Sequence, residues 1–266
     1  MNDTTIKQTP QSSQELLTPL RSVLSQPSLE LLAKSVLDRL ETPAQEDWRA
    51  SNSELDYLCQ VLCAKHSYRA NKFIHELLQV GLPLDRIYRK YLAEAARRLG
   101  TDWENDTRSF EQVSLASARI YKIMDSLRKR QPVPVQSCQP RLAFAAVPGE
   151  QHTLGVEMAT DLFRREGWDV AHLVGPSHEE ILLTLEDKSI FLLGLSASGS
   201  RHQAALIRLI LALRMIRPEV RVIVSGAITQ TENSLALNVG IDAVVRDVPQ
   251  ALEVVRDLAS QGERRP

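Results

Sequence analysis

The chain has 266 residues, of which 43% are hydrophobic and 24% charged, and its formal net charge is −1. This composition is typical of a soluble globular protein, and the length suffices for one large or two ordinary domains. The near-zero charge excludes a global attraction to nucleic acid or to an anionic membrane. No apolar run reaches membrane-spanning length, and the three cysteines make no disulfide framework, so we expect a cytoplasmic protein without a membrane partner.

Residues 1–25 are rich in Thr, Gln, Ser and Pro, which predicts a mobile N-terminal tail. Over residues 26–130 apolar side chains recur at helical spacing, and no strand signal interrupts them. We expect an all-α helical bundle domain of four or five helices, with a turn after Gly100 that carries Trp103. The expected helices centre on Leu29–Leu40, Leu55–Leu62, Phe73–Val80, Pro83–Ala95 and Ser109–Leu127.

Within the expected bundle, Cys59, Cys63 and His66 share a C-x₃-C-x₂-H spacing. A metal or redox site is conceivable, because Cys59 and Cys63 fall on one helix face. Two small buried thiols on a core stripe are the commoner arrangement, and further ligands for a closed zinc site are lacking.

Residues 131–140 contain three prolines and predict an extended linker. From residue 141 short apolar runs alternate with amphipathic helices, so residues 141–266 are expected to form a flavodoxin-like α/β domain with a five-stranded parallel sheet. The expected strands are Leu142–Val147, Asp169–Val174, Ile190–Leu195, Val220–Val224 and Ala243–Val245. The expected helices are Thr153–Glu166, His178–Glu186, Arg201–Ile216, Thr229–Asn238 and Pro249–Ser260.

A histidine follows the first expected strand, at the sheet edge where open α/β sheets bind ligands. Glu150, His152 and Gly155 make the pattern E-x-H-x-x-G. It resembles the D-x-H-x-x-G signature of cobalamin-binding domains, with Glu150 in place of Asp. The resemblance implies that His152 replaces the corrinoid's own base as the lower ligand of cobalt, and that Glu150 holds the other ring nitrogen.

Two further motifs follow at spacings close to those of that family. Ser196-Ala197-Ser198 resembles its S-x-L or S-x-T motif, and Ser225-Gly226 stands where the family has two glycines. Departures at Glu150 and Ser225 leave weakened or absent cobalamin binding as an alternative. The resemblance implies that Thr153, Leu154 and Gly155 shape the entry of the cofactor's nucleotide tail. It further implies that the tail's slot is lined by Ser196, Ser198, Ser225, Gly226 and Ala227, and that Gln151 and Ala197 also contact the cofactor.

The stretch Leu99–Ala118 resembles the helical cap that precedes many cobalamin-binding domains. The resemblance implies that Trp103, Phe110 and Val113 contact the upper face of the corrin. The Glu-His pair found in adenosylcobalamin light sensors has no counterpart here, which favours hydroxocobalamin or a similar form. His172, His178 and His202 are alternative cobalt ligands, each expected to be a surface or capping residue.

Three functions compete for a cobalamin-binding chain of this kind. A DNA-binding photosensor is disfavoured, because residues 1–50 contain no helix-turn-helix with a basic recognition helix. The run from Trp103 to Ala116 is similar to the proteobacterial photosynthesis regulators AerR and PpaA. That resemblance implies a light- and cobalamin-responsive antirepressor, not an enzyme, that contacts a CrtJ/PpsR-type repressor of photosynthesis genes. A corrinoid methyl carrier of a methyltransferase system is the alternative.

Overall fold

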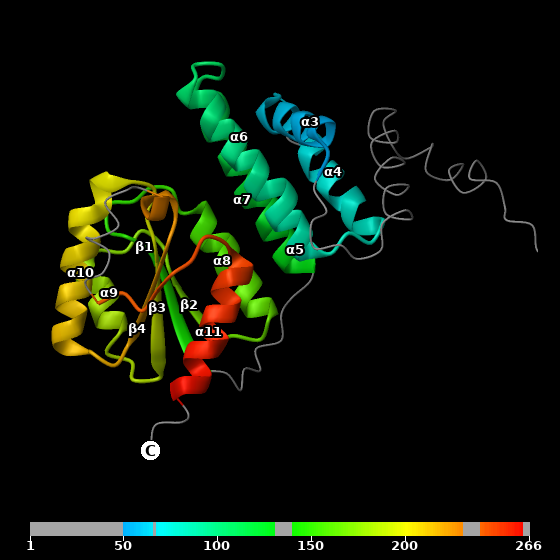
Figure 1. Cartoon of the computed structure of the whole chain (residues 1–266). Helices are drawn as coiled ribbons and strands as arrows, with labels where there is room; N and C mark the ends of the chain where they lie inside the picture. Colours follow the sequence, from blue (N-terminus) through cyan, green and yellow to red (C-terminus); the bar gives the residue numbers. More distant parts are fainter. Residues whose placement is uncertain (1–49, 66–67, 131–139, 231–239, 263–266) are drawn as a thin grey trace, which may run out of the picture. The chain divides into compact units, whose positions relative to one another are not determined.

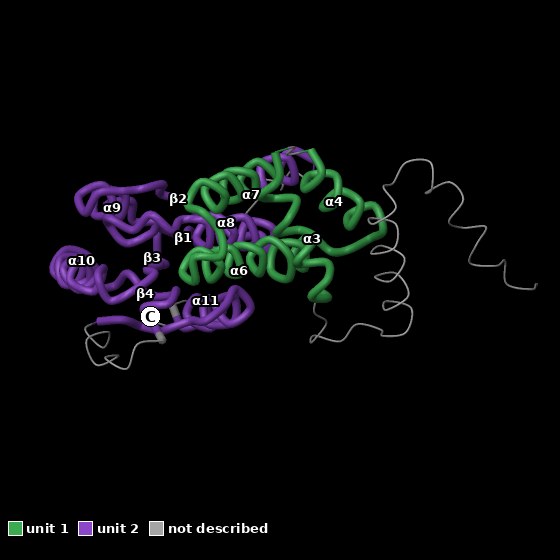
Figure 2. Tube along the Cα trace, turned by 90° about the horizontal axis from the view of Figure 1, so that it is seen from above, with its two compact units in different colours: residues 1–123 green, residues 124–266 purple. Residues whose placement is uncertain are grey.

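The computed structural model describes residues 50–65, 68–130, 140–230 and 240–262. The chain divides into two compact units, residues 1–123 and 124–266, shown in different colours in Figure 2. The predicted tail, the first predicted helix, His66 and most of the predicted linker lie outside the described residues. Among the described helices, none is long and apolar enough to cross a membrane.

Unit 1 is helical (Figure 1). Helix α3 (Asn52–Cys63) has a reciprocal cap at its start. The Ser51 hydroxyl accepts from the backbone N–H of Glu54 at 3.2 Å, and the Glu54 carboxylate accepts from the backbone N–H of Ser51 at 2.7 Å. The described elements of unit 1 are α3 (Asn52–Cys63), α4 (Tyr68–Gln79), α5 (Leu84–Arg86), the π-helical segment η1 (Ile87–Leu92), α6 (Ala93–Glu104) and α7 (Phe110–Arg130). The residues of α7 from Met124 onward belong to unit 2.

The core of unit 1 is built from aromatic and leucine side chains. Phe73 and Tyr91 are buried and pack edge to face, with ring centroids 6.0 Å apart. The Tyr91 hydroxyl donates to Oε1 of the buried Glu54 at 2.9 Å, so neither polar group is left unpaired. The guanidinium of buried Arg119 donates to the carbonyl oxygen of Leu62 at 2.5 Å and satisfies the end of α3.

The predicted turn after Gly100 is wrong, because α6 continues to Glu104. A glycine inside a helix costs only about 1 kcal/mol relative to alanine, which the surrounding helical residues outweigh. The chain leaves the helix at Asn105, and Asp106 then adopts a positive φ of 55°. Trp103 therefore lies on the last turn of α6 rather than in a loop.

Unit 2 contains a five-stranded parallel sheet with the strand order β2-β1-β3-β4-β5. This order and the helices on both faces confirm the predicted flavodoxin-like α/β class and the helical region before it. The strands are β1 (Arg141–Ala146), β2 (Val170–Leu173), β3 (Ile190–Ser196), β4 (Arg221–Ser225) and β5 (Ala243–Val244). The helices are α8 (Leu154–Arg165), α9 (His178–Thr184), α10 (Gln203–Ile216) and α11 (Val248–Gly262), with short 3₁₀ segments η2 (Ser200–His202) and η3 (Ala227–Gln230).

Each face of the sheet has its own apolar core, because successive strand side chains point to opposite faces. Ala143 and Ala145 of β1 pack in one core together with Ile181 of α9 and Leu206 of α10. Figure 1 shows α9 and α10 on this face of the sheet. Leu142 and Phe144 pack on the other face, where α8 and α11 lie. Most of the helix predicted over residues 229–238 falls outside the described residues.

Candidate functional site

The buried carboxylate of Glu150 joins two loops at the carboxyl edge of the sheet. Glu150 follows β1, and its side chain is fully buried, whereas Ser198 follows the neighbouring strand β3. Oε1 accepts from the backbone N–H of His152 at 2.8 Å and lies 2.7 Å from its ring Nδ1. Oε2 accepts from the backbone N–H of Ser198 at 2.6 Å. One carboxylate therefore fixes both loops.

The surroundings of Glu150 keep the carboxylate ionised. Burial alone raises the pKa of Glu150, but hydrogen bonds from the Ser198 side chain and from the backbone of His152 and Ser198 outweigh it. The pKa is lowered to about 2. An ionised carboxylate only accepts hydrogen bonds, so the His152 nitrogen that faces it, Nδ1, carries the hydrogen.

His152 presents the opposite side of its ring to solvent. Its side chain is 63% exposed, although Nδ1 is bonded to a buried group. Nε2 has no partner among the described residues and carries a free lone pair in this tautomer. A neutral imidazole with a carboxylate on one nitrogen and a free lone pair on the other is the arrangement of a metal-ligating histidine.

The ends of β3 and β4 approach closely beside this loop. A Cβ at Gly226, where φ is +95°, would lie 2.2 Å from the carbonyl oxygen of Ala197. That oxygen accepts from the backbone N–H of Ile228 at 3.2 Å, so it cannot move freely. The Ser225 hydroxyl donates to the carbonyl oxygen of Leu195 at 3.4 Å, which gives this side chain a partner at the position where the resemblance implies a glycine.

The remaining predicted cofactor contacts of unit 2 lie along the same edge. Thr153 and Leu154 are half-buried at the start of α8, while Gln151 and Gly155 are exposed. Ser196, Ser198 and Ser225 are half-buried, Ala197 is buried, and Ala227 is exposed. The structure thus places every predicted contact residue of unit 2 at the last position of β3 or β4, or in the loops and helix starts that follow β1, β3 and β4.

The three predicted cap residues belong to unit 1. Trp103 at the end of α6 and Phe110 at the start of α7 form a tilted aromatic pair with centroids 6.3 Å apart. Trp103 is 46% exposed and Phe110 is 69% exposed, while Val113 is half-buried. Large aromatic side chains gain by burial, so an exposed pair indicates a binding surface more than a core contact.

The expectation that His202 is a surface or capping residue is wrong. It precedes α10, but its side chain makes no cap and is buried, with 7% of the residue exposed. Its Nδ1 lies 3.0 Å from Oε2 of Glu150. The sequence offered one signal, since His202 falls four residues after Ser198 in the same loop. His172 is half-buried, and burial lowers its pKa, while His178 is half-buried at the first position of α9.

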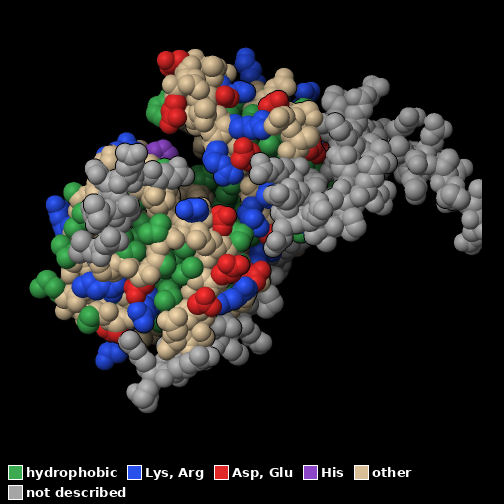
Figure 3. Space-filling model, viewed as in Figure 1, with side chains coloured by type: hydrophobic (Ala, Val, Ile, Leu, Met, Phe, Trp, Pro, Cys, Tyr) green, Lys and Arg blue, Asp and Glu red, His purple; other side chains and the backbone are tan. Residues whose placement is uncertain are grey.

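Other features of the described residues offer no competing metal site. No group of three or more His, Cys, Asp or Glu side chains that could hold a metal ion occurs in the described ranges. Cys59 is buried in the core, as expected, whereas Cys63 is half-buried. Burial raises the pKa of Cys59 to about 11 and also raises that of Cys63, which disfavours the reactive thiolate in both. Figure 3 shows basic and acidic side chains interspersed on the visible face, without a large patch of one sign.

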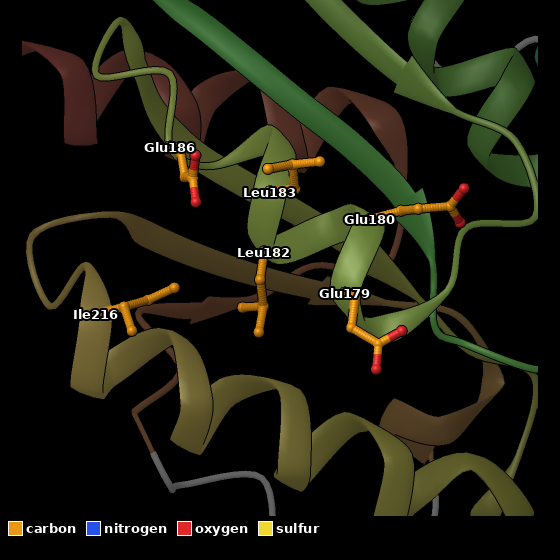
Figure 4. A pocket seen from close by; sticks show the side chains of 6 residues that line it. All are labelled: Glu179, Glu180, Leu182, Leu183, Glu186 and Ile216. Atoms are coloured by element: carbon orange, nitrogen blue, oxygen red, sulfur yellow. The ribbon is translucent and has the colours of Figure 1, made fainter.

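A shallow pocket between α9 and α10 combines carboxylates with apolar side chains. Figure 4 shows that Leu182 and Glu179 point into the space between the two helices, whereas Glu180 points away from it. Glu180 is held elsewhere, because its carboxylate accepts from the backbone N–H of Ser177 at 2.7 Å. This pocket has no histidine or thiol and is unsuited to a transition metal.

Comparison with known proteins finds a family match over the part of the chain that contains Glu150 and His152. Residues 140–256 match the family described as B12 binding domain. This match confirms the predicted resemblance of the α/β unit to cobalamin-binding domains and supports cobalamin binding. The helical cap and its residues are not part of the matched range.

Two similar proteins extend the comparison. An uncharacterized 20.5 kDa protein from the bchF-crtJ intergenic region of Rhodobacter capsulatus is 28% identical over 179 residues, which cover 65% of this chain and 92% of the relative. The structure of the monomethylamine corrinoid protein of Methanosarcina barkeri matches with a TM-score of 0.65 and 18% identity. It covers 77% of this chain and 98% of its own, and at this identity it shows the fold alone.

Proposed function

Because residues 140–256 match the B12-binding domain family, we propose that this protein binds cobalamin with Nε2 of His152 as the lower ligand of cobalt. The observation that carries the proposal is the state of the His152 ring. Nδ1 is committed to the ionised Glu150, while Nε2 is exposed and has no partner among the described residues. Borderline metals favour such an imidazole, and the carboxylate raises its basicity.

The structure around His152 fits a cofactor that carries a nucleotide tail. Gly226 is forced to be a glycine by the Ala197 carbonyl, so the ends of β3 and β4 are lined by small groups. Ser196, Ser198 and Ser225 place half-buried hydroxyls at the same edge. When bound, cobalamin supplies a cobalt centre whose upper ligand changes with light and redox state, and the chain's own residues hold the corrin and its tail in place.

We propose that Trp103, Phe110 and Val113 cover the corrin. Support comes from the exposure of the Trp103–Phe110 pair, since both large aromatic side chains remain open to solvent although they contact one another. A cover of this kind accommodates a small upper ligand, as in hydroxocobalamin, more readily than a bulky adenosyl group.

The biological role we propose is regulation through protein contact, without catalysis. The related Rhodobacter capsulatus protein is encoded between bchF and crtJ, which supports a link to photosynthesis genes. The proposed partner is a repressor of the CrtJ/PpsR type, and cobalamin occupancy would set how this chain contacts it. A methyl carrier is the second candidate, since the fold is shared with a monomethylamine corrinoid protein.

Absorption titration with hydroxocobalamin tests the cofactor proposal. The native protein is expected to shift the corrin bands, and His152→Ala is expected to abolish the shift. His178→Ala is the matched control, since it removes a half-buried histidine at the start of α9 and leaves Glu150 untouched. A native protein without any shift, or a His152→Ala variant with an unchanged shift, would contradict histidine ligation.

Release of a CrtJ/PpsR-type repressor from its operator DNA tests the regulatory proposal. We expect the cobalamin-loaded native protein to release the repressor, and the His152→Ala variant to leave the repressor–DNA complex intact. Adenosylcobalamin should act only after illumination. If the loaded native protein neither binds the repressor nor affects its DNA complex, the regulatory proposal is wrong and the methyl-carrier candidate takes its place.

A further inference from the structure

A second histidine lies against the carboxylate that serves His152. His202 ends η2, directly before α10, and reaches back to the loop after β1. Its Nδ1 lies 3.0 Å from Oε2 of Glu150, and its Nε2 lies 3.3 Å from the carbonyl oxygen of Gly149. The buried carboxylate thus has one histidine on each oxygen, exposed His152 on Oε1 and buried His202 on Oε2.

The ring of His202 is surrounded by acceptors. Its Nδ1 is buried and within ion-pair distance of Oε2, although the two groups are not aligned as an ordinary hydrogen bond. Oε2 also accepts from the backbone N–H of Ser198 at 2.6 Å, and Ser198 stands in the loop that leads to His202. Burying a polar atom without an aligned hydrogen-bond partner destabilises the folded state, so its presence here indicates a functional role.

We propose that His202 is a positioning residue for the cobalt ligand, acting through Glu150. By occupying the Oε2 side, it fixes the rotation of the carboxylate so that Oε1 remains on Nδ1 of His152. His152 is thereby held in the tautomer that leaves Nε2 free. The inference rests on the proposed function, since it concerns the same histidine and the same cofactor.

The proposal assigns a specific atom of His202, so the substitutions can be matched. His202→Asn places a donor near the position of Nδ1, His202→Gln places one near Nε2, and His202→Leu fills the space without a donor. If His202 acts through Nδ1, the Asn variant retains its effect and the Gln and Leu variants lose it. A purely structural role would rank the variants by stability instead.

The first readout needs no cofactor. Long-range ¹H–¹⁵N correlation spectra of the cobalamin-free protein report which ring nitrogen of His152 carries the hydrogen. We expect the native protein and His202→Asn to show the Nδ1–H form, and His202→Gln and His202→Leu to show a mixture. Folded Gln and Leu variants that retain the native His152 spectrum would overturn the proposal.

The second readout is affinity for hydroxocobalamin by absorption titration. Loss of a group that orients a metal ligand weakens binding by about tenfold or more. We therefore expect this loss for His202→Gln and His202→Leu and near-native affinity for His202→Asn, and equal affinity in all variants would overturn the proposal. If the native protein does not bind hydroxocobalamin, the proposed function fails, while the ¹⁵N spectra still decide the role of His202. If His202→Leu does not fold, the Asn–Gln pair carries both readouts.

Discussion

The backbone N–H of Ser198 donates to Oε2 of Glu150 at 2.6 Å, and this bond joins the loop after β1 to the loop after β3. Sequence motifs that lie far apart in the chain therefore meet on one carboxylate. The charge of that carboxylate is part of the fold as well as of the site, because its hydrogen bonds all favour the ionised form.

Acid should destabilise the protein partly through Glu150. Its folded pKa of about 2 lies below the value of 4.5 for an ordinary glutamate, so its contribution is present above pH 4.5 and is lost as the pH falls toward 2. We expect Glu150→Gln to lower the free energy of unfolding by about 2 kcal/mol at pH 7, and by much less near pH 2. Urea denaturation at pH 7, 4 and 3 measures this, and parallel pH profiles of the two proteins would contradict it.

Gly226→Ala should disrupt the edge of the sheet. The added methyl group would lie 2.2 Å from the Ala197 carbonyl oxygen, in a backbone conformation that alanine disfavours. We expect a loss of about 3 kcal/mol in the free energy of unfolding. Gly199→Ala is the control, since its φ is 179° and no atom lies within 4 Å of the new Cβ. Equal stabilities of the two variants would show that β3 and β4 do not approach as described.

Arg128→Ala should expose the dependence of α8 on α7. The Arg128 guanidinium donates to Oδ2 of Asp161 at 2.7 Å and to Glu157, and the Asp161 side chain is only 4% exposed. Removing the cation takes a charged partner away from a buried carboxylate, so we expect a loss of about 2 kcal/mol. Lys129→Ala removes an exposed pair with Asp125 and should cost less than about 0.5 kcal/mol in the same chemical denaturation. Similar losses in both variants would contradict a stabilising pairing of Arg128 with Glu157 and Asp161.

Trp103→Ala and Phe110→Ala separate binding from stability. Both side chains are exposed, so truncation should change the free energy of unfolding by less than about 1 kcal/mol. If the pair covers the corrin, each variant should weaken hydroxocobalamin binding by about fivefold or more. Phe73→Ala is the opposite control, because that ring is buried and its loss should cost about 3 kcal/mol. Native affinity in both exposed variants would remove these residues from the site.

The α/β class could be predicted from the sequence because each strand of the buried sheet is a short apolar run next to an amphipathic helix. A parallel sheet also predicts that Glu150, Ser198 and Gly226 lie at one edge, because each follows a strand and the carboxyl ends of parallel strands meet at the same edge. The exact end of α6 could not be predicted, because helix propensity at Gly100 is a weak term that packing of Leu99 overrides.

His202 escaped prediction for a different reason. Periodicity places it at the start of α10, where a histidine is ordinarily exposed or capping, and local pattern carries no information about the chain that packs opposite. Its burial depends on the loop after β1, which lies on the neighbouring strand in space but far away in sequence. Contacts of this kind follow from topology, so they emerge only once the strand order is known.

The pairing of Arg128 with Glu157 and Asp161 decides where a fragment of this protein should begin. The apolar pattern and the prolines suggest a cut between residues 131 and 140, whereas the compact α/β unit begins at Met124, inside α7. A fragment that starts at residue 141 would leave behind Arg128, whose guanidinium pairs with the buried Asp161 carboxylate at 2.7 Å. A fragment that starts at residue 124 retains that pairing and is the better choice for expressing the α/β unit alone.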